Sequence, residues 1–167
     1  CEELREAIRQ YLARNRGIRV ALEQIIIGSG SEYLYSLILQ LLGKDRIFAL
    51  EDPSYAKIRQ VYQANGIQCD FLKMGTAGIK TAELTRTKAS VLHVTPFNSF
   101  PSGVTASVSK RHEYLRWAEN GRYIIEDDFE SEFSVSKKPE ETLFTDTKND
   151  NVIYMNTFSM TISPSLR

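Results

Sequence analysis

In the stretch Tyr123-Ile124-Ile125-Glu126-Asp127-Asp128-Phe129, three apolar residues are followed by three consecutive carboxylates and a phenylalanine. Its apolar residues are β-branched or aromatic, which is typical of a buried strand. Carboxylates directly after such a strand lie at its carboxyl end, the edge at which open α/β sheets bind ligands. The segment therefore predicts a strand over 123–125 with charged groups at the ligand-binding edge of a sheet.

Apolar runs and helical patterns alternate along the rest of the chain. Further strands are expected over 24–27, 46–50, 67–74, 90–94 and 152–155, and helices over 2–16, 31–42, 55–64, 81–85 and 107–120. Glycine closes most of the helical patterns, as is usual at helix C-termini. Short apolar strands that alternate with helices predict an α/β fold with a mostly parallel, doubly wound sheet.

Composition excludes several classes of protein. Lys+Arg and Asp+Glu both number 21, so this chain has no excess positive charge with which to grip nucleic acid by itself. Cys1 and Cys69 form neither a disulfide framework nor a C-x-x-C pattern, which favours a reducing cytoplasm. The longest apolar stretch, 34–42, is too short to cross a bilayer. The polar segment 134–151 is expected to be a surface excursion.

Gly28-Ser29-Gly30-Ser31-Glu32 joins an expected strand to an expected helix. Small residues let the backbone approach a ligand, and the free N–H groups of a helix's first turn suit a phosphate. A glycine-rich connection with Ser31 as the N-cap explains the turn equally well, because it matches neither the dinucleotide nor the P-loop fingerprint. Both interpretations stay open for the turn alone.

Two other loops follow expected strands. In Glu51-Asp52-Pro53-Ser54-Tyr55, the tyrosine either covers a planar ring or packs at the start of the next helix. In the loop Thr95–Gly103, two prolines fix the path of the chain. Asn98 and Ser99 in that loop either bind a ligand or simply close a turn.

The three carboxylates after the strand repel one another and raise one another's pKa unless a cation or a donor lies nearby. A protonated pyridine nitrogen is one such partner and a divalent metal is another. His93 and His112 form no ligand-spaced cluster, so no metal site is expected, although carboxylates alone can hold Mg²⁺. We expect His93 to be a hydrogen-bonded core residue and His112 to lie on a solvated helix face.

Six motifs, in order along the chain, resemble the aminotransferase-like domain of MocR-type (GntR-superfamily) transcription regulators. They are L-R-E-A-I-R-Q-Y-L-x-x-x-R-G-I, G-S-G-S-E, E-D-P-S-Y, T-P-F-N-S-F-P-S-G, I-I-E-D-D-F-E-S-E-F and T-F-S-M-T-I-S-P-S-L-R. The likeness covers nearly the whole chain. The E-D-D-F-E-S-E-F and T-P…F-P-S-G stretches favour these regulators over ordinary aminotransferases, whose corresponding loop usually reads N-P-T-G. The resemblance implies the large domain of a fold-type I pyridoxal-phosphate (PLP) protein.

The phosphate site that the resemblance implies combines backbone N–H groups with polar side chains. Its members are Gly30, Ser31, Glu32, Thr157, Ser159 and Arg167. The backbone N–H groups of Ser31 and Glu32 would hold the phosphate together with the guanidinium of Arg167. The two hydroxyls at 157 and 159 would lie near it.

At the ring end of the cofactor, the resemblance implies that Tyr55 stacks on the pyridine ring and that Asp127 pairs with its nitrogen. Two positions depart from the family pattern. Met160 stands where the Schiff-base lysine is usual, and Phe129 stands where a tyrosine hydroxyl usually faces the phenolic oxygen. Methionine can neither form an imine nor transfer protons, so we expect non-covalent PLP and no transaminase turnover. Without the resemblance, Met160 is simply a core filler at the end of a strand.

The function expected from the resemblance is a PLP-binding, effector-sensing domain of a bacterial transcription regulator. Residues 1–20 would form a helix that leads into a PLP-binding core over 21–167, as a fragment of a longer protein. Its expected partners are a second copy in a homodimer and an amino-acid-like or PLP-derived effector. DNA would be bound only through a domain outside this chain, and no membrane is expected. One alternative is a class I/II aminotransferase with a substituted lysine, and another is a degenerate domain that only dimerises.

Overall fold

A computed structural model of the chain describes residues 1–129 and 141–159. In these residues the strands form one sheet with the order β3-β2-β1-β4-β5-β6. The strands are β1 Phe48–Asp52, β2 Cys69–Gly75, β3 Gly78–Ile79, β4 Val91–Val94, β5 Tyr123–Asp127 and β6 Val152–Met155. Neighbouring strands pair in parallel except β2 and β3, which are antiparallel. The mostly parallel α/β sheet is therefore confirmed.

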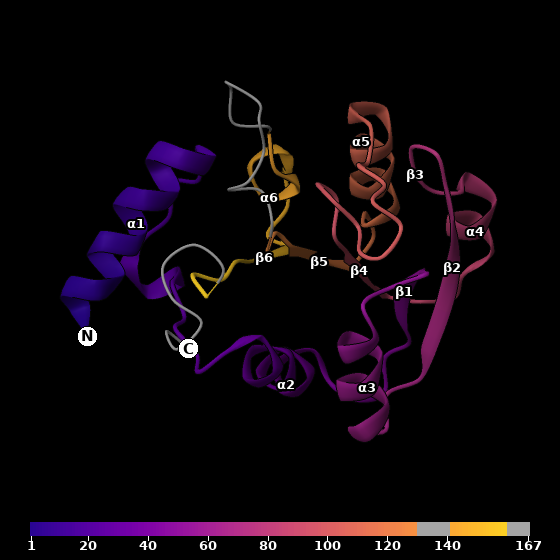
Figure 1. Cartoon of the computed structure of the whole chain (residues 1–167), viewed down its shortest axis with the longest axis horizontal. Coiled ribbons are helices and arrows are strands. Elements are labelled where there is room, and N and C mark those ends of the chain that lie inside the picture. The colour runs from indigo at the N-terminus through magenta and orange to yellow at the C-terminus, as the bar shows by residue number, and fades with distance from the viewer. Residues whose placement is uncertain (130–140, 160–167) are drawn as a thin grey trace.

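Helices cover both faces of this sheet (Figure 1). They are α1 Glu2–Arg16, the 3₁₀ helix η1 Leu22–Gln24, α2 Ser31–Leu42, α3 Ala56–Ala64, α4 Thr81–Arg86, α5 Val108–Trp117 and α6 Leu143–Asp146. In Figure 1, α2 and α3 lie below the sheet, α5 and α6 lie above it, and α1 lies beyond β6. No helix in the described part of the chain is long and apolar enough to span a membrane.

Alternation of side chains along the central strands produces two separate hydrophobic cores. Phe48 and Leu50 of β1 pack with α2 and α3, where Tyr62 is fully buried. Ala49, between them in sequence, packs with α5 through Tyr114 and Trp117. Successive strand residues point to opposite faces, so a strand buried on both sides is apolar at nearly every position.

The strand order places the candidate residues at one edge of the sheet. From β1 the chain passes outward to β2, and it later returns to β4 on the other side of β1. Ligands of open α/β sheets bind at such a reversal, beyond the carboxyl ends of the strands. β1, β4 and β5 run in the same direction, so Glu51, Thr95 and Asp127 meet at this edge.

Two expectations are wrong. The strand expected over 24–27 is absent. Gln24 ends the 3₁₀ helix η1, and in the extended residues that follow Ile25 is buried whereas Ile26 and Ile27 are 67% and 42% exposed. The strand that the sequence pattern missed is the short β3. The segment 134–151 is not simply a polar excursion, since Thr142 and Leu143 are fully buried where α6 packs onto the sheet. Residues 134–140 of that segment lie outside the described residues. The other expected strands and helices are present, with ends shifted by a few residues.

Candidate functional site

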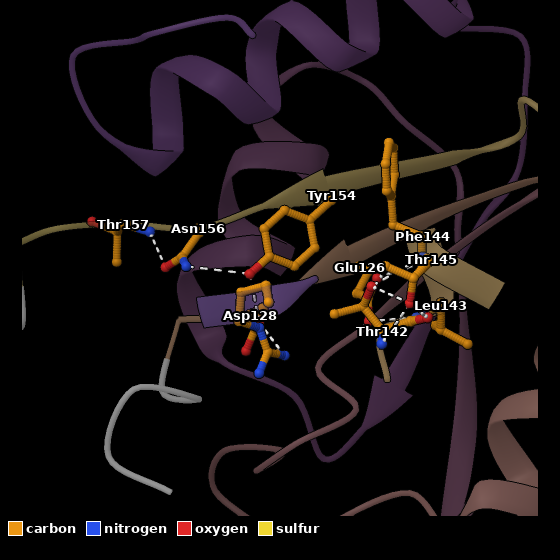
Figure 2. Close-up of polar contacts among 10 residues, drawn as sticks. Glu126, Asp128, Thr142, Leu143, Phe144, Thr145, Tyr154, Asn156 and Thr157 are labelled. Atoms are coloured by element: carbon orange, nitrogen blue, oxygen red, sulfur yellow. Dashed lines mark hydrogen bonds and ion pairs between the residues drawn. The ribbon is translucent and has the colours of Figure 1, made fainter. Parts of the chain in front are cut away.

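Glu126 of β5 caps the short helix α6 rather than facing a ligand. Its carboxylate accepts the backbone N–H groups of Leu143 at 2.9 Å and Phe144 at 3.0 Å. Figure 2 shows these contacts, with Glu126 on the α6 side of the strand. Burial raises the pKa of Glu126 to about 7, although the two hydrogen bonds act in the opposite direction. Glu126 is therefore a buried structural carboxylate.

This burial predicts a specific pH dependence of stability. A glutamate carboxyl ordinarily titrates near 4.5, so the folded chain, with Glu126 at about 7, binds the proton more tightly than the unfolded chain. The resulting stabilisation is complete below about 4.5 and is lost as the pH rises through about 7. The difference between the two pKa values corresponds to about 3 kcal/mol.

We expect urea unfolding between pH 5 and pH 8 to show this loss in the unsubstituted protein but not in Glu126→Gln. Glu119→Gln, at an exposed carboxylate, is the matched control and is expected to keep the original pH profile. Parallel profiles for the unsubstituted protein and Glu126→Gln would contradict the raised pKa of Glu126.

Asp128, just after β5, forms a buried ion pair with the last residue of α1. Arg16 Nη2 lies 2.7 Å from Asp128 Oδ2, and both side chains are almost completely buried. The hydroxyl of Tyr154 on β6 donates to the same oxygen at 2.6 Å (Figure 2). The guanidinium of Arg16 also lies 4.8 Å from the centre of the Phe97 ring. Asp128 therefore fastens α1 to the edge where β5 and β6 end.

Asp127, the last residue of β5, is buried but has a different kind of partner. The hydroxyl of Tyr35 on α2 donates to Asp127 Oδ2 at 2.5 Å, and Nε2 of His93 on β4 lies 3.3 Å from the same oxygen. No lysine or arginine of residues 1–129 or 141–159 pairs with Asp127. Of the three neighbouring carboxylates, Asp127 is thus the one that a ligand cation would neutralise.

A small hollow, with about 150 Å³ of empty space that includes open solvent, lies beside Asp127 at this edge of the sheet. It is lined by Thr95, Phe97, Asn98, Asp127, Asp128 and Phe129. The predicted residues Asp127 and Phe129 therefore share one hollow, together with Asn98 from the loop after β4. A buried carboxylate at such a hollow is suited to a ligand with a protonated nitrogen.

Glu51, at the end of β1, anchors the loop that forms one wall of the hollow. The hydroxyls of Thr95 and Ser99 both donate to Glu51 Oε2 at 2.6 Å. Burial raises the pKa of Glu51, while the hydrogen bonds from these hydroxyls and from the Thr95 N–H lower it. Ser99 is fully buried and bonded to Glu51, so of the two candidate polar residues in this loop Asn98 lines the hollow and Ser99 supports it.

The predicted phosphate turn lies at the start of α2. The N-cap is Gly30 rather than Ser31, because the φ of Gly30 is 115°, a backbone conformation that side chains with a Cβ rarely adopt. Ser31 and Glu32 are the first two residues of a 12-residue helix, so their N–H groups have no acceptor within it. One turn later Tyr35 reaches Asp127, which brings this helix start close to the carboxylate.

The remaining predicted residues do not line the hollow. Tyr55 immediately precedes α3, is 43% exposed, and meets Phe100 edge-on at a ring distance of 5.9 Å. The hydroxyls of Thr157 and Ser159, just after β6, are 2.9 Å apart. Met160 and Arg167 lie outside the described residues, so their assigned roles stay predictions.

Both histidines lie where the sequence predicted, but the contacts that His93 and Tyr35 make with Asp127 were not predicted. His93 is a core residue hydrogen-bonded to Tyr62, and His112 lies half exposed on α5, as expected. That His93 also contacts Asp127 was not foreseen. Tyr35 had a weak signal, since a tyrosine four residues after Ser31 shares its helix face. The described residues contain no group of three His, Cys, Asp or Glu that could hold a metal ion.

Residues 1–163 match the sequence profile of the family described as aminotransferase class I and II. Two regulators are similar over nearly the whole chain. One is the uncharacterized HTH-type transcriptional regulator YdeL of Bacillus subtilis, 34% identical over 99% of this chain and 36% of its own length. The other is the probable rhizopine catabolism regulatory protein MocR of Rhizobium meliloti, 30% identical over 98% of this chain and 34% of its own length.

A similar solved structure is that of kynurenine aminotransferase from Pyrococcus horikoshii, in complex with PMP, KYN and KYA. It is 27% identical, has a TM-score of 0.85, and covers 96% of this chain and 42% of its own. The chain thus spans about a third of the length of the two regulators and under half of this enzyme.

Proposed function

The chain belongs to the aminotransferase class I and II family, and from this premise we propose that it is the PLP-binding, effector-sensing domain of a bacterial transcription regulator. The observation that carries the proposal is Asp127. It is a buried carboxylate at the ligand-binding edge, beside a hollow, and among the described residues no lysine or arginine pairs with it. Similarity to YdeL and MocR supports the regulator, and similarity to an aminotransferase in complex with PMP supports the cofactor.

The residues at the sheet edge fit PLP in charge and in chemistry. Asp127 Oδ2 accepts hydrogen bonds from two protein donors, which leaves Oδ1 to accept a hydrogen bond from the protonated pyridine nitrogen. The first-turn N–H groups of Ser31 and Glu32 would donate to the phosphate. Tyr55 would cover the ring from the end of β1, and Asn98 would donate from the opposite loop. When bound, PLP supplies an electron-withdrawing ring and a reactive aldehyde.

Two substitutions make this site one for binding rather than for turnover. Met160, at the position of the Schiff-base lysine, has no nitrogen with which to form a covalent bond to an aldehyde or to move a proton. Phe129 lines the hollow without a hydroxyl. PLP would therefore be held by the Asp127 ion pair, by phosphate contacts and by ring stacking. Arg167, Thr157 and Ser159 would complete the phosphate site.

The proposal extends to the whole protein, of which this chain would be the ligand-binding part. DNA would be contacted by a helix-turn-helix domain elsewhere, as the names of the similar regulators suggest. The protein would act in the cytoplasm as a homodimer, with an amino-acid-like or PLP-derived effector. Such an effector changes DNA binding only if its affinity differs between two conformations of the regulator.

Binding and turnover are separated by titrating the full-length protein with PLP and then treating it with borohydride. We expect a saturable visible circular-dichroism band, and we expect dialysis to remove the PLP even after borohydride treatment. In Met160→Lys, borohydride is expected to fix one PLP per chain, which mass spectrometry locates at position 160. Absence of any bound PLP in the unsubstituted protein would refute the cofactor. Rapid amino-group transfer to an oxo acid by Met160→Lys would favour the aminotransferase alternative.

A further inference from the structure

Tyr35 connects the two ends of the proposed cofactor site. It is a buried residue of α2, 3% exposed, whose hydroxyl donates to Asp127 at 2.5 Å across 92 positions of sequence. Ser31, the first residue of α2, lies one turn earlier on the same helix. A single phenol thus ties α2, the helix that begins at the predicted phosphate turn, to the carboxylate at the end of β5.

A second set of donors reaches the same carboxylate from the sheet. The hydroxyl of Tyr62 lies 2.6 Å from Nδ1 of His93. Burial, followed by the nearby charge of Asp127, raises the pKa of Tyr62 well above its ordinary value, so the phenol keeps its proton. Nδ1 of His93 is the side-chain acceptor within hydrogen-bond distance of that proton among the described residues. A neutral imidazole that accepts at Nδ1 carries its own proton on Nε2. That proton faces Asp127 Oδ2, 3.3 Å away.

Both donor paths therefore end on one oxygen. Asp127 Oδ2 accepts hydrogen bonds from Tyr35 and His93. No donor from the described residues lies within hydrogen-bond distance of Oδ1. A carboxylate held in this way cannot rotate about its terminal C–C bond without breaking both hydrogen bonds. Buried and fully directed hydrogen bonds of this kind select one orientation of a side chain.

We propose that Tyr35 is a positioning residue of this site, one that fixes Oδ1 of Asp127 as the oxygen offered to the ring nitrogen. The inference rests on the proposed PLP-binding function and deepens it. Tyr35 touches no cofactor atom in this scheme and acts through Asp127. Because Tyr35 belongs to α2, whose first turn is the predicted phosphate end, its bond to Asp127 also sets the spacing between the two anchoring points.

The test compares two buried tyrosines in the full-length protein. Tyr35→Phe removes the donor to Asp127 and keeps the ring, and it is expected to weaken PLP binding about tenfold, as loss of a hydrogen bond to a charged group does. Tyr114→Phe is the matched control, because its hydroxyl is equally buried but bonds to the backbone N–H of Ile79 in the other core. It is expected to leave PLP affinity unchanged.

The effect of Tyr35→Phe on PLP affinity is expected to change sign when Asp127 is replaced by asparagine. This change distinguishes a positioning role of Tyr35 from a general structural effect. With Tyr35 present, the amide oxygen is held in the place of Oδ2 and the amide NH₂ faces the ring nitrogen. Tyr35→Phe in that background removes the closer of the two donors that hold the amide oxygen and leaves only His93, so the amide turns its oxygen toward the ring more readily. We therefore expect Tyr35→Phe to weaken PLP binding in the unsubstituted protein and to strengthen it several-fold, roughly threefold to tenfold, in Asp127→Asn.

Equal losses of affinity in both backgrounds, or equal affinities for Tyr35→Phe and Tyr114→Phe, would overturn the role of Tyr35 while leaving PLP binding itself intact. Failure of the unsubstituted protein to bind PLP would instead reject the proposed function. Should Tyr35→Phe fail to fold, Tyr62→Phe tests the other donor path. This variant removes the donor that fixes the tautomer of His93, and it is expected to weaken PLP binding about threefold. An unchanged PLP affinity in Tyr62→Phe would contradict the claim that hydrogen bonds from His93 and Tyr35 orient Asp127.

Discussion

Asp127→Asn is expected to weaken PLP binding by the full-length protein about 100-fold, the upper range for a hydrogen bond to a charged group. The substitution keeps the shape of the side chain but removes its charge. Tyr35 and His93 both donate to the position of Oδ2, so the amide oxygen occupies that position. The amide NH₂ then stands where Oδ1 was, and it meets the protonated ring nitrogen as a second donor.

Visible circular dichroism during a PLP titration measures this loss, and urea unfolding checks that the variant folds. Asp70→Asn is the matched control, because Asp70 also accepts a hydroxyl and a cationic group, from Thr87 and Arg86, but lies far from the hollow. It is expected to bind PLP as the unsubstituted protein does. An Asp127→Asn variant that folds and keeps full affinity would show that Asp127 does not pair with the ring.

Arg16→Met is expected to lower the free energy of unfolding by about 3–5 kcal/mol, the usual effect of leaving one partner of a buried ion pair alone. Arg16 and Asp128 are both nearly inaccessible to solvent and lie 2.7 Å apart. Methionine fills much of the same volume, so the loss comes from the charge of Asp128. After the substitution, the hydroxyl of Tyr154 is the one side-chain donor to that carboxylate among the described residues.

Chemical denaturation of four proteins separates the charge from the packing. Arg14→Met, at an exposed arginine of the same helix, is expected to change stability by less than about 0.5 kcal/mol. The double variant Arg16→Met with Asp128→Asn is expected to regain much of the loss, because no buried charge is left unpaired. Equal stabilities of Arg16→Met and Arg14→Met would mean that the ion pair contributes nothing to the fold.

Local sequence signals explain why most helices and strands were predicted correctly. Gly17, Gly43 and Gly66 follow α1, α2 and α3 with positive φ, the conformation that glycine adopts most readily at a helix end. The β-branched run at 24–27 carries the same local signal as a real strand. It forms none because two of its isoleucines face solvent, a fact fixed by the rest of the fold and not by the run itself.

The candidate site was harder to predict, because its contacts join distant parts of the chain. Sequence placed three carboxylates at the end of β5 but gave no means of telling them apart. Glu126 is satisfied by α6, Asp128 by α1 and Asp127 by α2 and β4. Only the folded arrangement separates a structural carboxylate from the one left for a ligand. The family resemblance pointed to Asp127, and it gave no indication of Tyr35 or His93.

A crystal structure of the full-length protein grown with excess PLP tests most directly whether a non-covalently bound cofactor lies at this edge of the sheet. We expect the ring nitrogen about 3 Å from Oδ1 of Asp127, a normal hydrogen-bond distance. The phosphate is expected at the first turn of α2, with no covalent bond between PLP and the chain. A cofactor bound elsewhere, or one bonded to a lysine with Asp127 turned away from its ring, would contradict non-covalent capture by Asp127.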